Sequence, residues 1–169
     1  MTQYLFEPTA PATIPIIGSE KLYPVNRIFC VGRNYEAHAA EMGAVVDRDA
    51  PFYFTKSPTT LVMAEGEIAY APRTENYHYE MELVFALKSG GTNIAEADAL
   101  SHIYGCAAGL DMTRRDLQNK AKENRKPWDT AKDVDESAVI TPLRQMAEVP
   151  SVASGRIHLS QNGTVKQDA

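Results

Sequence analysis

The sequence has few cysteines, no run of basic residues and no long apolar stretch. Its only two cysteines, Cys30 and Cys106, lie far apart in apolar, strand-like runs, which favours buried free thiols over a disulfide. A formal net charge of −5 without a basic patch argues against a nucleic-acid partner. No segment is apolar for long enough to cross a membrane, and the N-terminus lacks the basic and apolar regions of a secretory signal. These absences predict a soluble protein of the reducing cytoplasm.

The composition that remains is that of an ordinary globular domain. Of 169 residues, 44% are hydrophobic and 23% charged, which allows one domain with a core. Residues 1–24 are rich in proline and show little periodicity, so we expect an extended N-terminal segment followed by a single domain over 25–169. The many short strand and helix signals in that domain predict a mixed α+β fold.

Local patterns place the expected elements of this domain. A hairpin is expected over 156–168, with Asn162-Gly163 as its tight turn. The last expected helix opens with a capping box from Thr113 to Asp116. The expected strands are 27–31, 52–56, one or two within 61–72, 78–88 and 104–112, and the expected helices are 35–42, 95–102 and 113–125.

The most informative motif is Glu80-Met81-Glu82, which lies in an alternating run over 77–87. In a strand, His78, Glu80 and Glu82 point to one face, and the larger apolar side chains point to the other. Two neighbouring carboxylates repel one another and are costly to bury unpaired, and a bound Mg²⁺ or Mn²⁺ relieves both problems. A solvated acidic strand face is the alternative, because an isolated Glu-x-Glu motif has low specificity.

Asp111 is the natural third oxygen ligand. It ends an expected strand whose same-face neighbours are small, namely Gly105, Ala107 and Gly109. A face without bulky side chains allows other groups to approach closely. The alternative is an aspartate that simply helps to start the following helix.

His38 and Glu41 are three residues apart on the expected helix 35–42, so they share one of its faces. A carboxylate that is hydrogen-bonded to a histidine orients the ring and raises its basicity, which produces a general base able to take a proton from water. The alternative is a surface pair.

Three cations stand in or beside apolar and turn segments, and they could recognise substrate carboxylates: Arg33, Lys56 and Lys132. Gln118, on the helix after Asp111, could donate to a substrate oxygen. Taken singly, each of these four residues is more commonly a solvated surface group.

Together these segments resemble the fumarylacetoacetate hydrolase superfamily, with the closest likeness to its bacterial acylpyruvate hydrolases. Each matching piece has low specificity alone, but their order and spacing follow the family from about residue 22 onward. The matching stretches are 29–43, 54–58, 78–83, 109–118 and 126–132.

The resemblance implies a mixed-sheet roll that forms homodimers and binds Mg²⁺ or Mn²⁺, with Ca²⁺ as a further candidate. It implies metal ligation by Glu80, Glu82 and Asp111. The catalytic residues that it implies are His38, Glu41 and Lys132, and the substrate-binding residues are Arg33, Lys56 and Gln118.

The activity implied by the resemblance is metal-dependent cleavage of a carbon–carbon bond in an acylpyruvate such as fumarylpyruvate. The products would be pyruvate and a carboxylic acid, as in the gentisate pathway of aromatic-compound catabolism. Two alternatives stay open: a 2-oxo acid decarboxylase or isomerase of the same superfamily, and a truncated, inactive chain that still binds metal.

The sequence departs from the family at two places. The family usually has an aromatic residue shortly after the position of Lys132, whereas here the run continues Asp133-Val134-Asp135. The family also continues past the Asn-Gly hairpin with further strands, which this sequence lacks. We therefore expect an incomplete sheet, partly exposed apolar strand faces and self-association.

Overall fold

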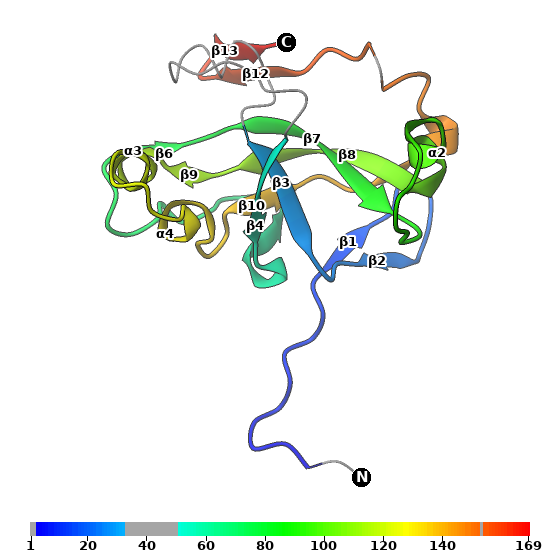
Figure 1. The fold of residues 1–169 in the computed structure, drawn as a ribbon, viewed down its shortest axis with the longest axis horizontal. Coiled ribbons are helices and arrows are strands. Elements are labelled where there is room, and N and C mark those ends of the chain that lie inside the picture. Colours follow the sequence, from blue (N-terminus) through cyan, green and yellow to red (C-terminus); the bar gives the residue numbers. More distant parts are fainter. Residues whose placement is uncertain (1–2, 33–50, 153) are drawn as a thin grey trace.

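The computed structural model describes residues 3–32, 51–152 and 154–169 (Figure 1). A five-stranded mixed sheet lies at its centre, with a long middle strand that pairs on both of its sides. The prediction of a mixed α+β fold is confirmed. The strands are β8 (Ile103–Asp111) in the middle, β7 (Met81–Leu87) antiparallel to it on one side, β10 (Ala138–Ile140) and β11 (Arg144–Gln145) antiparallel to it on the other, and β5 (Leu61–Met63) parallel to β10.

Four two-stranded antiparallel ribbons surround this sheet. They are β1 (Thr13–Pro15) with β2 (Leu22–Pro24), β3 (Ile28–Gly32) with β4 (Phe52–Lys56), β6 (Tyr77–His78) with β9 (Thr113–Arg114), and β12 (His158–Gln161) with β13 (Thr164–Asp168). Strand β4 has the predicted bounds 52–56, and β3 lies within one residue of its prediction.

The helices are short, and none that the structure describes is long and apolar enough to cross a membrane. Helices α3 and α4 lie at one end of the sheet and α2 lies at the other (Figure 1). The α-helices are α2 (Glu96–Ala99), α3 (Arg115–Glu123) and α4 (Asp129–Lys132), and the 3-10 helices are η1 (Pro58–Thr60), η2 (Leu100–His102) and η3 (Met146–Glu148).

The N-terminal segment contributes to the core. Ile14 and Ile16 are buried against Leu143, and backbone hydrogen bonds link both sides of Leu143 to Pro15 and Ile17 at 2.8 and 2.9 Å. Part of the segment 1–24, expected from its prolines to be extended and irregular, therefore forms β1 and β2. The remaining buried members of this cluster are Ala86, Ala107 and Ile140.

The acidic run differs from the continuous strand predicted over 78–88. It is interrupted at Tyr79 and Glu80, because β6 pairs with β9 whereas β7 pairs with β8. The interruption leaves Glu80 at the point where the chain passes from one ribbon to the other.

The predicted capping box does not form. Thr113 lies in β9, and its hydroxyl donates to the carbonyl oxygen of Asp111 at 3.1 Å, so the helix begins later, at Arg115. Asp116 instead accepts hydrogen bonds from the Thr74 hydroxyl at 2.5 Å and the Glu75 amide at 3.1 Å. Pairing of Thr113 with His78 in the ribbon outweighed the local helix-start signal.

The C-terminal hairpin is confirmed. Asn162 and Gly163 both have positive φ, 52° and 80°, as a tight two-residue turn requires. The expected helix 35–42 lies outside the residues that the structure describes. Apolar side chains on the strands are partly exposed as expected, including Phe29 at 61% and Phe85 at 42%.

A substitution at Gly105 of β8 tests how tightly the strands of the sheet pack against one another. A Cβ at this position would overlap the backbone carbonyl oxygen of Arg144 in β11, which cannot move without breaking the strand pair. We predict that Gly105→Ala lowers the free energy of unfolding by about 1–3 kcal/mol. Gly90→Ala is the control, because a Cβ there meets nothing within 4 Å. Equal urea midpoints for the two variants would contradict this packing.

Candidate active site

Strands β7 and β8 bring the predicted acidic residues to one face. The Asp111 amide donates to the carbonyl oxygen of Glu80 at 2.8 Å, and Glu82 stands opposite Gly109. Residues opposite one another in an antiparallel pair share a face, so the acidic face of β7 continues into the small-residue face of β8. A Cβ at Gly109 would crowd the side chain of Val84 and the carbonyl oxygen of Val139, which explains why position 109 holds a glycine.

The ammonium of Lys132 joins the two buried carboxylates. Its Nζ lies 2.6 Å from Glu80 Oε2 and 2.8 Å from Asp111 Oδ2, and the residue is only 2% exposed. Lys132 ends the short helix α4, and its Nζ also lies 4.8 Å from the centre of the Phe54 ring. Glu80 and Asp111 therefore converge on one point, the Lys132 ammonium, and their role as ligands of a metal ion stays a prediction.

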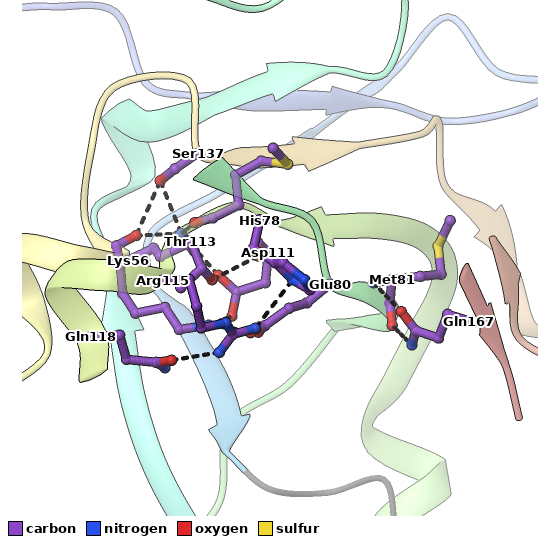
Figure 2. Close-up of polar contacts among 12 residues, drawn as sticks. Lys56, His78, Glu80, Met81, Asp111, Thr113, Arg115, Gln118, Ser137 and Gln167 are labelled. Atoms are coloured by element: carbon purple, nitrogen blue, oxygen red, sulfur yellow. Dashed lines mark hydrogen bonds and ion pairs between the residues drawn. The ribbon is translucent and has the colours of Figure 1, made fainter. Parts of the chain in front are cut away.

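Lys56, at the end of β4, approaches Asp111 from the other side (Figure 2). Its Nζ lies 2.9 Å from Asp111 Oδ1 and donates to the carbonyl oxygens of Met112 (3.0 Å) and Lys132 and to the Ser137 hydroxyl (2.9 Å). An ammonium has three protons, and four acceptor oxygens surround this one. Asp111 Oδ1 is buried and pairs with the charge of Lys56, but no hydrogen bond of good geometry reaches it.

Arg115, the first residue of α3, completes the cation set (Figure 2). Its Nη2 donates to Glu80 Oε1 at 2.5 Å and lies 3.2 Å from His78 Nδ1, while its Nη1 donates to Gln118 Oε1 at 2.5 Å. Glu80 therefore interacts with a lysine at one oxygen and an arginine at the other. Gln118 is 1% exposed, and the bond from Arg115 orients its amide group.

The surroundings change the pKa values of the two lysines in opposite directions. Burial disfavours both ammonium groups. For Lys56 burial prevails over the attraction of Asp111, and its pKa lies below the ordinary value. For Lys132 the Asp111 and Glu80 carboxylates outweigh burial and raise the pKa. Lys132 is therefore a firmly charged ammonium at neutral pH, whereas Lys56 is the easier of the two to deprotonate.

The structure brings together five of the nine predicted site residues: Lys56, Glu80, Asp111, Gln118 and Lys132. Glu82, two residues after Glu80 and within β7, is half-buried. His38, Glu41 and Arg33 lie outside the described residues.

Sequence reasoning did not single out Arg115 or Ser137 as site residues. Arg115 lies in the matching segment 109–118, four residues after Asp111, and its place in that segment was the available signal. Ser137, whose hydroxyl links Lys56 to the Lys132 backbone, carried no signal.

The donor chemistry fits a hard divalent cation. Within 3–32, 51–152 and 154–169, no three Asp, Glu, His or Cys residues are already arranged around one ion position. Glu80 and Asp111 do converge, however, and Asp111 Oδ1 is a buried oxygen without a hydrogen bond. Carboxylate oxygens are the ligands that Mg²⁺ and Mn²⁺ prefer. A cation bound here would compete with Lys132 for the same oxygens.

The sequence matches the model of the fumarylacetoacetate (FAA) hydrolase C-terminal family over residues 27–169. The chain belongs to this family. It is 51% identical over 130 residues to the fumarylpyruvate hydrolase of a Ralstonia species, and it spans 67% of the length of that protein. It is 36% identical to the mouse mitochondrial oxaloacetate tautomerase FAHD1, and it spans 63% of the length of that protein. The prediction of a hydrolase-family enzyme is confirmed.

The solved structures agree with this assignment. The fumarylpyruvate hydrolase of Pseudomonas aeruginosa, in complex with Mn²⁺ and pyruvate, superposes with a TM-score of 0.94 at 43% identity. The match covers 99% of this chain and 73% of that one. The predicted mixed-sheet roll of the fumarylacetoacetate hydrolase family is therefore confirmed.

Removal of the Lys132 ammonium tests the ion cluster. In Lys132→Met, Glu80 and Asp111 lose a shared cation while remaining buried, so the free energy of unfolding in metal-free buffer should fall by about 3–5 kcal/mol. Because folding raises the pKa of Lys132, its contribution is fully present below the unfolded value of about 10.4 and is lost only at more alkaline pH. Urea denaturation at pH 7 therefore measures all of it.

Lys120→Met is the matched control, because Lys120 is an exposed lysine on α3 and its loss should change stability by no more than about 0.5 kcal/mol. If both variants unfold at the same urea concentration, the cluster does not stabilise the fold.

Proposed function

We propose that this chain carries the centre of a metal-dependent acylpyruvate hydrolase, with fumarylpyruvate or a close analogue as substrate. The observation that carries the proposal is the buried pair Glu80 and Asp111, held by Lys56, Lys132 and Arg115. The identity of 51% to a fumarylpyruvate hydrolase supports the choice of substrate.

The charge of the site favours an anionic substrate. Lys56, Lys132 and Arg115 surround Glu80 and Asp111. With Glu82 counted as the third proposed ligand, three carboxylates stand against three cations, so the formal charges balance. A divalent cation added to this balanced set would leave an excess of two positive charges in a largely buried place. Fumarylpyruvate has two carboxylates, and a positive, water-poor site attracts such a dianion strongly.

In this proposal Glu80, Glu82 and Asp111 hold Mg²⁺ or Mn²⁺, with Ca²⁺ as a further candidate. The bound ion would supply a Lewis acid for the oxygens of the 2-oxo acid. Lys132 offsets the charge of both buried ligands Glu80 and Asp111, and Arg115 offsets that of Glu80. All three Lys56 protons are donated within the protein, so its role is to position Lys132 and to offset the charge of Asp111.

The proposed bond cleavage begins with the pair His38 and Glu41. His38, oriented by Glu41, takes a proton from water, and the resulting hydroxide adds to the carbonyl carbon of the acyl group. The carbon–carbon bond to the pyruvate portion then breaks, and its electrons remain on the pyruvate fragment as an enolate. The imidazolium returns a proton to that fragment, so one substrate and one water give pyruvate and one carboxylic acid.

Two further residues are proposed to orient the substrate. The oxygen of Gln118 accepts from Arg115, which aims its amide nitrogen for donation to a substrate oxygen. Arg33 is proposed to pair with a substrate carboxylate. The homodimer, the cytoplasmic location and a place in the gentisate pathway remain predictions.

A second candidate is tautomerisation of a 2-oxo acid. Relatives from nematode, mouse and plant, at 33–36% identity, are named oxaloacetate tautomerases. The same centre could move a proton between carbon and oxygen of such an acid without using water. The higher identity to the hydrolase places this activity second.

A panel of substrates separates the two functions. We predict Mn²⁺-dependent pyruvate release from fumarylpyruvate and other acylpyruvates, abolished by EDTA and restored by added Mn²⁺ or Mg²⁺. Pyruvate is measured with a coupled dehydrogenase, and the enol-to-keto conversion of oxaloacetate is followed by ultraviolet absorbance. Tautomerisation without pyruvate release would replace the hydrolase proposal, and inactivity on both would contradict a catalytic role for this chain.

His38→Ala tests the proposed base. Loss of a general base should lower the turnover number for pyruvate release by about 10²–10⁴-fold. The Kd for Mn²⁺ should stay nearly unchanged, because His38 is not a proposed ligand. His102→Ala is the control, since His102 lies at the end of η2 and its ring contacts Ser89. Near-normal turnover in His38→Ala would remove this residue from the mechanism.

A further inference from the structure

The C-terminal hairpin places the primary amide of Gln167 against the backbone of β7. Gln167 of β13 accepts a hydrogen bond from the backbone N–H of Met81 at 2.9 Å and donates one to the Met81 carbonyl oxygen at 2.8 Å (Figure 2). Both backbone groups of one residue are thereby paired by one side chain. The amide of Gln167 thus takes the place that a neighbouring peptide would have in a sheet.

Met81 is the residue between Glu80 and Glu82. Its backbone groups point to the edge of β7 that faces away from β8, and β8 is the only described strand that pairs with β7. Edge strands whose backbone groups are unpaired fray and shift more readily than paired ones. The two hydrogen bonds from Gln167 to Met81 therefore restrain the backbone that carries Glu80 and Glu82.

Two other features indicate that the backbone of β7 is weakly restrained by its own strand pairing. The chain is interrupted just before the strand, at Tyr79 and Glu80, and the pairing with β8 shifts register between Ala86 and Leu87. A further side-chain bond between hairpin and acidic run joins the Tyr79 hydroxyl to Gln161 and is long, at 3.4 Å. The Gln167 bonds are thus the firmer attachment.

Two features of the hairpin, its turn and an ion pair at its open end, hold Gln167 in position against Met81. Its turn is set by Asn162 and Gly163, and its open end is closed by a two-fold ion pair from Arg156 to Asp168 at 2.6 and 2.7 Å. Asp168 directly follows Gln167. Gln167 is also the only residue of β13 that is not exposed.

We propose that Gln167 is a positioning residue for the candidate metal centre. Its amide fixes the backbone at Met81 and thereby holds the Glu80 and Glu82 carboxylates on their shared face, ready for one cation. The inference rests on the proposed function in so far as the two glutamates bind metal. The effect of Gln167 on the Met81 backbone can be measured in the absence of metal.

Two variants and one control test this role in the 169-residue chain. Gln167→Met keeps the length of the side chain and removes both hydrogen bonds. Gln167→Glu keeps an acceptor for the Met81 N–H and loses the donor to its carbonyl oxygen. Gln161→Met is the control, because it alters the same hairpin and leaves the Met81 contact intact.

The first measurement is hydrogen exchange at the Met81 amide in metal-free protein. Exchange should be fastest in Gln167→Met, slower in Gln167→Glu and unchanged in Gln161→Met. The Gln167→Glu result keeps the test decisive if Gln167→Met does not fold. Equal protection in all four proteins would overturn the inference.

The second measurement is the Kd for Mn²⁺, read from the electron paramagnetic resonance signal of the free ion. Gln167→Met should raise this Kd by about tenfold, as loss of a group that orients a ligand does, while Gln161→Met should change it less than twofold. Unaltered affinity in Gln167→Met would overturn the positioning role and leave the proposed function intact. Absence of Mn²⁺ binding in the unaltered chain would overturn both.

Discussion

The ion pair of Lys132 with Glu80 and Asp111 is the interaction on which the rest of this site depends. It joins helix α4 to strand β8 and to the start of β7, so three separate segments meet at one ammonium. Buried charges are tolerated only when partners surround them, and here Lys56 and Arg115 supply the remaining partners. The helices and strands that carry these residues are held in place by the same contacts that offset the charge of the carboxylates. Stability and readiness for a cation therefore come from one set of charges.

Much of the sheet could be predicted because alternation and turn chemistry are local signals. The shared side of Glu80 and Glu82 followed from the period of two in the sequence, whereas the antiparallel register of β7 and β8, which brings Asp111 to the same face, is a long-range feature. The turn at Asn162 and Gly163 was equally local. The capping box from Thr113 failed because the partner that drew Thr113 into a ribbon, His78, is far away in the sequence.

The site was harder to predict than the sheet, for a physical reason. Lysine and glutamine are normally solvated, so the burial of Lys56, Lys132 and Gln118 could not be inferred from composition or periodicity. It follows from long-range pairing of opposite charges, and only the likeness to a family pointed to these residues beforehand. Arg115 was missed because adjacent arginines near a helix start usually face solvent. Gln167 was missed because its partner is a backbone, which has no sequence signature.

The contact of Ile14 and Ile16 with Leu143 has a consequence for how the chain folds. The two ends of this contact are separated by most of the sequence, so the core that they form cannot close before Leu143 has been synthesised. The parallel pairing of β5 with β10 is similarly non-local. Contacts between distant residues slow folding, because the entropy of closing a long loop is lost before the contact contributes. Until that point, the apolar side chains of β1 lack the partner against which they pack, and the core behind β7 stays open.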